Sequence, residues 1–326
     1  MMEITPRTAR QWSRLGSRGI FGQAILSVAE DHPELMVLSA DLGNSSGLDR
    51  FKAAYPDQFL NTGIAEQNMI GVAAGLAKEG FTVFATSFAP FIAMRASEQV
   101  RMNLGYMEMN VKAVAIGSGI AMGLLGNSHF GLEDVAVMRA IPNLTVVCPA
   151  DCAAIIKTVE AAVAFDGPMY IRLTGAANNP PVYTEDFAFQ IGRAIPLRDG
   201  GDVGLVACGT MVHVALRAAD ALAEQGIAAS VIDMHTLKPL DGAALDALAA
   251  RVPALVTVEE HTVIGGLGSA VAEHTAAQPD RVRHLALGLR DAFVKTGQYE
   301  YMLEQEGLVG PAVAERVRAF LREERT

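Results

Sequence analysis

Short apolar runs alternate with longer helical patterns along most of the chain, from about Ser17 onward. Such a rhythm is typical of βα units that feed a mostly parallel sheet. The apolar runs show little polar alternation, as expected of parallel strands that are buried on both faces. In the first part of the chain the predicted strands are Met36–Ala40, Phe59–Thr62, Thr82–Thr86, Lys112–Ile116, Thr145–Cys148 and Met169–Leu173, and the predicted helices include Glu66–Lys78, Ile92–Leu104 and Asp151–Phe165.

The rhythm is interrupted after Leu173 by Thr-Gly-Ala-Ala-Asn-Asn-Pro-Pro, a cluster of turn formers without periodicity. A second α/β series follows, with predicted strands at 203–208, 229–232, 254–258 and 283–287. We therefore predict an α/β fold of two doubly wound, mostly parallel-sheet domains, at 17–177 and 191–326, with a linker at 178–190. The length of 326 residues agrees with two domains.

Composition and charge narrow the range of partners. Hydrophobic residues make up 51% of the chain and charged residues 19%, which excludes a disordered protein. The net charge of −10 repels phosphate backbones and anionic lipids, so we expect neither nucleic acid nor a membrane as a partner. The three cysteines lie in apolar runs and the N-terminal residues lack a secretory pattern, which predicts a soluble, cytoplasmic protein.

Some motifs carry weak signals when read alone. The glycine-rich stretches Gly117–Gly123 and Gly265–Gly268 are better explained by tight turns than by a dinucleotide site. Cys148 and Cys152 lack the spacing of a metal-binding pair. His129 lies in a polar loop after a predicted strand, where α/β sheets place ligands, so a catalytic or binding role is open for it beside a purely structural one.

Glu66 begins a helix that is otherwise almost wholly apolar. Taken alone, a glutamate in the first turn is more often a charge favoured by the helix dipole than a catalytic group. However, Phe88 and Phe91 follow at the end of the next strand, so a carboxylate and two aromatic rings are predicted to share one sheet edge. That combination suits a flat, nitrogen-containing ring.

These residues are part of a longer series of motifs that resembles the transketolase family of thiamine diphosphate enzymes. Gly63-Ile-Ala-Glu-Gln-Asn-Met69 is similar to the segment that holds the family's cofactor-activating glutamate. Several separated motifs in the same order make the resemblance specific. The similarity continues through Thr86–Phe91, Arg95–Met102, Ser128–Asp134, Ile141–Asp151, Tyr170–Arg172, Val231–Leu240 and Glu259–Gly268.

The resemblance implies a thiamine diphosphate cofactor, which carries the chemistry while the protein tunes it. Glu66 would hydrogen-bond the N1′ atom of the aminopyrimidine and so activate the cofactor, and a low local dielectric would strengthen that bond. Phe88 and Phe91 would pack on the pyrimidine ring. Asp41 would line the cofactor channel.

The same resemblance implies transfer of a two-carbon ketol unit between sugar phosphates. His129 would lie against the donor as a second catalytic residue, Ser45 would line the substrate channel, and Arg172 would bind a sugar phosphate. Two departures put the usual sugars in doubt. Gly117 and Leu125 stand where many transketolases carry a histidine and an acidic residue that read donor hydroxyls.

The family's diphosphate and Mg²⁺ motif is absent. That motif is Gly-Asp-Gly followed downstream by Asn-Asn, whereas here Gly201-Asp202 precedes Val203 and Asn178-Asn179 lies upstream. We therefore expect no metal ligands in this chain, with Mg²⁺ held by a separate subunit that carries the pyrophosphate-binding domain. The chain resembles the C-terminal subunit of a split transketolase, which implies a dimer of this subunit within a heterotetramer.

Three competing functions stay open. The beta subunit of a 2-oxo-acid dehydrogenase has the same two domains, but it usually has Thr-Pro where this chain has Thr62-Gly63. Synthesis of deoxyxylulose phosphate uses a similar glutamate motif, normally within one long chain. A non-catalytic regulatory or scaffold subunit would keep the fold, but the intact Glu66, Phe88, Phe91 and Arg172 count against it.

Overall fold

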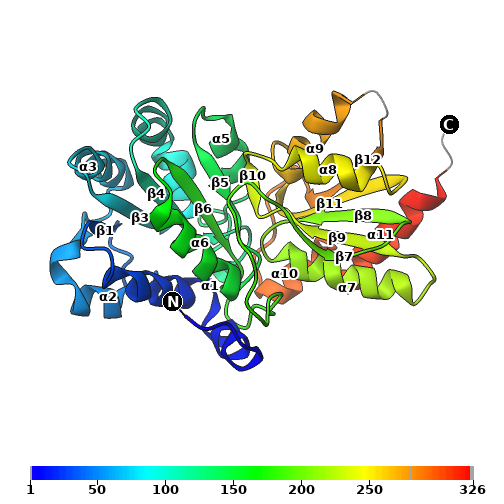
Figure 1. Cartoon of the computed structure of the whole chain (residues 1–326), viewed down its shortest axis with the longest axis horizontal. Helices are drawn as coiled ribbons and strands as arrows, with labels where there is room; N and C mark the ends of the chain where they lie inside the picture. The colour runs from blue at the N-terminus through cyan, green and yellow to red at the C-terminus, as the bar shows by residue number, and fades with distance from the viewer. Residues whose placement is uncertain (1, 279–280, 324–326) are drawn as a thin grey trace.

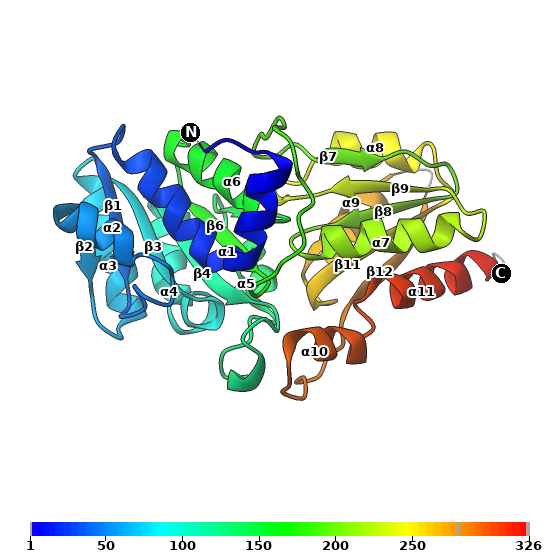
Figure 2. The same cartoon turned by 90° about the horizontal axis from the view of Figure 1, so that it is seen from below.

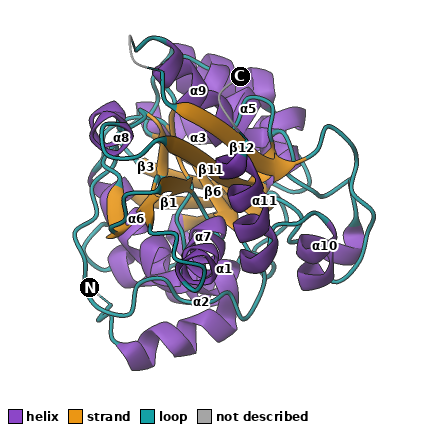
Figure 3. Ribbon diagram, turned by 90° about the vertical axis from the view of Figure 1, so that its right-hand side faces the viewer, coloured by secondary structure: helices purple, strands orange, loops and turns teal. Residues whose placement is uncertain are grey.

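The computed structural model of the chain describes residues 2–278 and 281–323. Two sheets lie side by side along the long axis of the molecule, as Figure 1 shows. Figure 3, seen along that axis, shows the sheets as a middle layer with helices above and below. The structure therefore confirms the predicted α/β class with two doubly wound, mostly parallel sheets.

The first sheet is built mainly from the first half of the chain. Its strand order is β10-β5-β6-β4-β3-β1-β2. Neighbouring strands are parallel, except that β10 pairs antiparallel with β5. The strands are β1 (Leu35–Ser39), β2 (Phe59–Asn61), β3 (Thr82–Phe88), β4 (Val111–Ser118), β5 (Thr145–Val147), β6 (Met169–Thr174) and β10 (Thr236–Lys238).

Helices cover both faces of the first sheet (Figure 1). On one side lie α1 (Pro6–Ala29), α2 (Asp49–Ala54) and α6 (Cys152–Ala164), and on the other α3 (Glu66–Lys78), α4 (Ser97–Gln99) and α5 (Asp134–Ala140). Short helical turns complete this half, namely η1 (Pro56–Gln58), η2 (Phe91–Arg95), η3 (Val100–Tyr106) and η4 (Gly123–Leu125). The hydrophobic pattern did not predict helix α1, which begins at Pro6 with Thr5 as its cap.

The second sheet has the strand order β12-β11-β8-β9-β7, and only its edge strand β7 runs antiparallel among the described residues. Its strands are β7 (Ile195–Arg198), β8 (Val203–Ala207), β9 (Ala229–Asp233), β11 (Ala254–Thr262) and β12 (Arg283–Leu289). The helices of this half are α7 (Met211–Ala223), α8 (Gly242–Ala249), α9 (Leu267–Ala276), α10 (Tyr299–Gln305) and α11 (Gly310–Arg322).

The two halves share a common interior. Strand β10 belongs to the second half in sequence but extends the first sheet. Buried apolar side chains of both halves also pack into the same clusters, with Leu173 and Met211 in one of them. The predicted division at 17–177, 178–190 and 191–326 stays a prediction, and the connection between β6 and β7 contains no helix or strand in the structure.

Two simple observations bear on the surroundings of the protein. None of the helices in the described ranges is long and apolar enough to cross a membrane. Cys148, Cys152 and Cys208 are all buried and free. The expected compartment stays a prediction.

Candidate active site

Glu66 lies at the first position of α3, and its side chain is only 1% exposed. The Ser87 hydroxyl donates a hydrogen bond to Oε1 over 3.0 Å, and Arg95 Nη1 donates to Oε2 over 2.7 Å. The amides at the start of α3 also favour a negative charge there. A carboxylate is thus buried at the carboxyl-terminal edge of the first sheet with a hydrogen-bond donor on each oxygen.

Two aromatic rings near the end of β3 are linked to this carboxylate through Arg95. Phe88 ends the fully buried strand β3, and Phe91 begins η2 after Pro90. Their ring centroids are 5.8 Å apart with planes at 78°, an edge-to-face arrangement. The Arg95 guanidinium carbon lies 4.1 Å from the Phe91 centroid, so Arg95 joins the carboxylate to the rings.

His129 completes this group from a different part of the chain. It follows η4 in the segment between β4 and α5, and its ring centroid is 5.5 Å from Phe88 and 5.3 Å from Phe91. The Ser128 hydroxyl lies 3.0 Å from its Nδ1 atom. The structure therefore brings the predicted residues Glu66, Phe88, Phe91 and His129 together through direct contacts or through Arg95.

Asp41 and Ser45 lie at the same edge of the sheet, in the loop after β1. Asp41 has a φ of 59°, in the left-handed region, and its backbone amide donates to Asn61 Oδ1 over 3.0 Å. Asn61 Nδ2 donates back to Asp41 Oδ1 over 3.0 Å. Ser45 is half-buried in this loop. Because β1 neighbours β3, this loop borders the edge at which Phe88 ends its strand.

Arg172 differs from its expected role in phosphate binding. Its side chain is buried on β6, where Nε and Nη2 donate to the two carboxylate oxygens of Asp134 over 2.8 and 3.1 Å. Nη2 also donates to the backbone oxygens of Gly131 and Glu260. The structure does not support a role of Arg172 in holding a sugar phosphate. Its guanidinium is buried and already paired with Asp134, so it is not accessible to a substrate.

Charge and hydrogen bonding explain why this pair is stable inside the protein. Burial would raise the pKa of Asp134, but Arg172, His261 and the hydrogen bonds from Arg172 and Tyr170 together hold that pKa below its usual value. The Tyr170 hydroxyl donates to Asp134 over 2.7 Å. Burial lowers the pKa of His261 to about 4, so this ring is neutral at pH 7 and accepts from the Val135 amide.

The sequence pattern assigned no role to Arg95 or Glu260. Arg95 carries a recognisable signal, because it follows Phe91 by four residues and so lies on the same side of a helical turn. Glu260 carries none, since its contacts come from distant segments. The described residues also contain no cluster of three or more His, Cys, Asp and Glu side chains that could hold a metal ion.

Family models match both halves of the chain. The transketolase pyrimidine-binding domain matches residues 14–179, and the transketolase C-terminal domain matches residues 192–313. A putative transketolase C-terminal section from Methanocaldococcus jannaschii is 38% identical, with 95% of this chain and 97% of that protein covered. A 6-deoxy-6-sulfo-D-fructose transketolase subunit from a Clostridium species is 40% identical, with 91% of each chain covered.

Solved structures agree with these matches. One solved structure is described as a split gene transketolase, inactive beta4 tetramer. It is 41% identical to this chain with a TM-score of 0.85, and the match covers 95% of this chain and 99% of the other. The transketolase of Campylobacter jejuni, at 22% identity and a TM-score of 0.77, shares the fold, and this chain covers 46% of it. These findings confirm the resemblance drawn from the motifs, and the chain belongs to the transketolase family.

Proposed function

We propose that the chain is one subunit of a split transketolase that transfers a two-carbon ketol unit between sugar phosphates. The observation that carries this proposal is the buried Glu66 carboxylate, which Arg95 links to the group of rings formed by Phe88, Phe91 and His129. Two relatives described as transketolase subunits, and one described as a putative transketolase C-terminal section, match this chain over most of their own length and support the division into subunits.

The residues present fit the pyrimidine end of thiamine diphosphate. A buried carboxylate can accept a hydrogen bond from a protonated ring nitrogen, and Glu66 is placed to hold N1′ of the aminopyrimidine in that way. Phe88 and Phe91 offer ring faces and edges for packing on a flat heterocycle. Thiamine diphosphate, when bound, supplies the nucleophilic carbon that takes up and passes on the two-carbon unit. Asp41 would border the cofactor from the neighbouring strand end.

His129 and Ser45 are the proposed contacts to the sugar. The two ring nitrogens of a histidine can donate or accept hydrogen bonds, which suits a contact with a carbonyl or hydroxyl of the donor sugar. Met122 shapes the same space, because a side chain at Gly117 would collide with the Met122 thioether and lie 3.4 Å from the Phe88 ring. An apolar group thus fills the position at which many transketolases read a donor hydroxyl, which favours a sugar other than the common pentose phosphates.

The diphosphate and Mg²⁺ are assigned to a partner subunit. The nearest equivalent of the phosphate motif, Gly201-Asp202, lies directly before β8, where the Asp202 carboxylate accepts from the Ala228 amide. We propose that a subunit with the pyrophosphate-binding domain closes the site, and that two copies of each subunit form a heterotetramer. The inactive state of the related beta4 tetramer agrees with this division.

Synthesis of deoxyxylulose phosphate is a second candidate activity, because synthases of this kind are among the relatives of the chain. Deoxyxylulose-5-phosphate synthases from Chlorobium luteolum and a Synechococcus species are 34% and 35% identical, but this chain spans only 48% and 46% of their length. The same experiment also tests two further functions, those of a 2-oxo-acid dehydrogenase beta subunit and of a non-catalytic subunit.

The test is reconstitution. The chain is mixed with a candidate partner that carries Gly-Asp-Gly and Asn-Asn, together with thiamine diphosphate and Mg²⁺, and ketol transfer between sugar phosphates is measured. Glu66→Gln is expected to lower kcat by about 10² to 10⁴-fold, the usual contribution of a positioned proton-transfer group. Glu79→Gln, at the exposed opposite end of α3, is the matched control and is expected to leave kcat unchanged.

Three results would contradict the proposal. Full transfer by this chain alone would remove the need for a partner. Unchanged activity in Glu66→Gln would remove the role of the carboxylate. Acyl transfer to a lipoyl domain, or condensation of pyruvate with glyceraldehyde 3-phosphate, in place of ketol transfer would assign the chain to a different thiamine diphosphate enzyme.

A further inference from the structure

The segment that carries His129 is a long excursion between β4 and α5, at residues 119–133. Gly119 and Gly131 close its base by exchanging two backbone hydrogen bonds of 3.0 and 2.9 Å. Within the excursion, Gly123 and Gly126 have positive φ angles of 53° and 73°. Glycine adds conformational freedom, so the position of His129 depends on what holds this segment from outside.

Glu260 holds the base of the segment from the second sheet. It lies on β11 and is 1% exposed. Its Oε1 atom accepts from the Ile120 amide over 2.8 Å, while Oε2 accepts from the Thr210 hydroxyl over 2.8 Å and the Tyr299 hydroxyl over 2.7 Å. A side chain at Gly119 would collide with this carboxylate. Glu260 therefore fixes the first turn of the segment against three elements of the second half.

Asn127 makes a second, independent attachment two residues before His129. Its Nδ2 atom donates to the Val294 backbone oxygen over 2.9 Å, and the Val294 amide donates back to Oδ1 over 3.1 Å. Both polar atoms of one side-chain amide are thus used on a single backbone position of the second half. Figure 2 shows this segment, in green-cyan, projecting on the same side of the molecule as α10, which follows Val294 in the chain.

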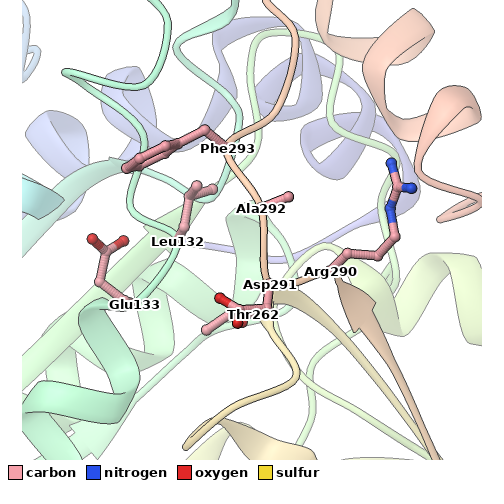
Figure 4. Close-up of a pocket in the computed structure, with 7 residues that line it drawn as sticks. All are labelled: Leu132, Glu133, Thr262, Arg290, Asp291, Ala292 and Phe293. Atoms are coloured by element: carbon pink, nitrogen blue, oxygen red, sulfur yellow. The ribbon is translucent and has the colours of Figure 1, made fainter.

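A cleft lies between the C-terminal end of this segment and residues 290–293 of the second half. It has a volume of about 370 Å³, and Figure 4 shows its lining. Leu132 and Glu133 line it from the segment, and residues 290–293 with Thr262 line it from the second half. Hydrogen bonds of Asn127, of Glu260 and of the Thr262 amide, which donates to the Leu132 backbone oxygen, join the segment to the second half around this space.

We propose that Asn127 and Glu260 are positioning residues through which the C-terminal half sets the location of His129 over Phe88 and Phe91. This inference rests on the proposed function, in which His129 faces the sugar. Neither residue touches the reacting group in this role. Loss of either attachment lets the segment move, and a displacement of about 1 Å at a reacting group can reduce a rate by about 10²-fold.

The test uses the variants Asn127→Ala and Glu260→Gln, with Gln225→Ala as the matched control. Gln225 is also an amide with two hydrogen bonds, to the Ala221 backbone oxygen and from Arg318, but it lies at the end of α7. Amide hydrogen exchange of the whole chain is expected to be faster across residues 119–131 in both variants and unchanged in the control. The ring signal of His129, assigned by its loss in His129→Gln, is expected to shift or broaden in Asn127→Ala.

In the reconstituted enzyme, the two variants are expected to lower kcat by about tenfold or more and to change KM by a smaller factor, because the side chains themselves remain and only His129 is displaced. Asn127→Ala combined with His129→Gln is expected to be no worse than His129→Gln alone, since the amide acts through the histidine. A strictly additive double variant, or exchange and ring signals that match the wild type, would overturn the positioning role.

The two proposals fail in different ways. If the wild-type complex shows no ketol transfer, the proposed function is wrong. The exchange and ring signals are read on the chain itself, so they still decide whether Asn127 and Glu260 position His129. Normal kcat in variants with fast exchange would overturn the positioning role while leaving the proposed function intact.

Discussion

The Arg95 guanidinium joins Glu66 to Phe91: its Nη1 atom lies 2.7 Å from Glu66 Oε2, and its central carbon lies 4.1 Å from the Phe91 centroid. The Arg95 side chain is 45% exposed, whereas that of Glu66 is 1% exposed. One half-exposed cation thus balances a buried carboxylate and at the same time orients a ring of the site. The charge of Glu66 and the orientation of the Phe91 ring therefore both depend on Arg95.

Arg95→Met is expected to lower kcat about tenfold and to weaken thiamine diphosphate binding. The reason is that the buried carboxylate loses its charge partner and Phe91 loses a cation on its face. Cofactor titration and initial rates of the reconstituted enzyme measure both effects. Arg95→Lys keeps the charge but not the planar stacking, so intermediate values are expected. Wild-type values in Arg95→Met would contradict this relationship.

Arg172→Gln is expected to destabilise the fold rather than to weaken substrate binding. Removing one partner of a buried ion pair typically costs about 3 to 5 kcal/mol, because the other charge is left uncompensated. Thermal unfolding measures the loss, and a lower Tm with unchanged KM in the protein that still folds is the expected pair of results. A normal Tm with a raised KM for sugar phosphates would instead restore a phosphate role for Arg172.

Stability is expected to depend on pH through Asp233. Burial raises the pKa of this carboxyl to about 8, its Oδ2 accepts from the Tyr183 hydroxyl over 2.8 Å, and its Oδ1 has no partner among the described residues. From about pH 4 to about pH 8 the folded chain keeps a proton that the unfolded chain has lost. Unfolding then releases a proton, so stability falls as the pH rises through this window.

Asp233→Asn is therefore expected to flatten the decline of Tm between about pH 5 and about pH 8, because the amide stays neutral. The remaining titrating groups contribute equally to both proteins, so the difference in Tm isolates Asp233. Asp199→Asn, at an exposed site paired with Arg251, is the control and is expected to follow the wild type. A difference in Tm that does not change with pH would show that Asp233 is not the source.

Asp151→Ala is expected to loosen the connection between the two halves. Asp151 caps α6 by accepting from the Ala154 amide over 2.8 Å, and its other oxygen accepts from the amides of Val182 and Tyr183. Losing the cap alone costs about 1 kcal/mol, and orphaned amides add to that loss. A lower Tm and faster proteolysis between β6 and β7 are the measurements. Asp151→Asn should recover part of both, and equal behaviour of the two variants would argue against the cap.

The sequence predicted the strands of both sheets well wherever a strand is buried on both faces. The strands it missed are β7 and β10, which run antiparallel at sheet edges. Strand β7 is partly exposed and contains Pro196, and β10 is three residues long, so neither produces a long apolar run. The expected helix at Ile92–Leu104 is instead divided into η2, α4 and η3, a local distortion that periodicity does not reveal.

The sequence predicted those site residues that lie at the ends of predicted strands or within the family's motifs. Glu66, Phe88 and Phe91 follow from neighbouring elements, and His129 came from its polar loop and the family resemblance. The buried ion pair of Arg172 could not be predicted, because its partner Asp134 lies 38 residues earlier and a buried charged pair leaves no local sequence pattern. The contacts of Glu260 depend likewise on how the two halves pack.

Strand β10 has a consequence for any attempt to divide the protein. It covers β5, which would otherwise expose a row of unpaired backbone groups at the edge of the first sheet. A fragment that ends before β7 would carry that bare edge, and bare edges recruit strands from other chains. The half that carries Glu66 therefore needs β10 from the C-terminal half to keep this sheet edge from aggregating.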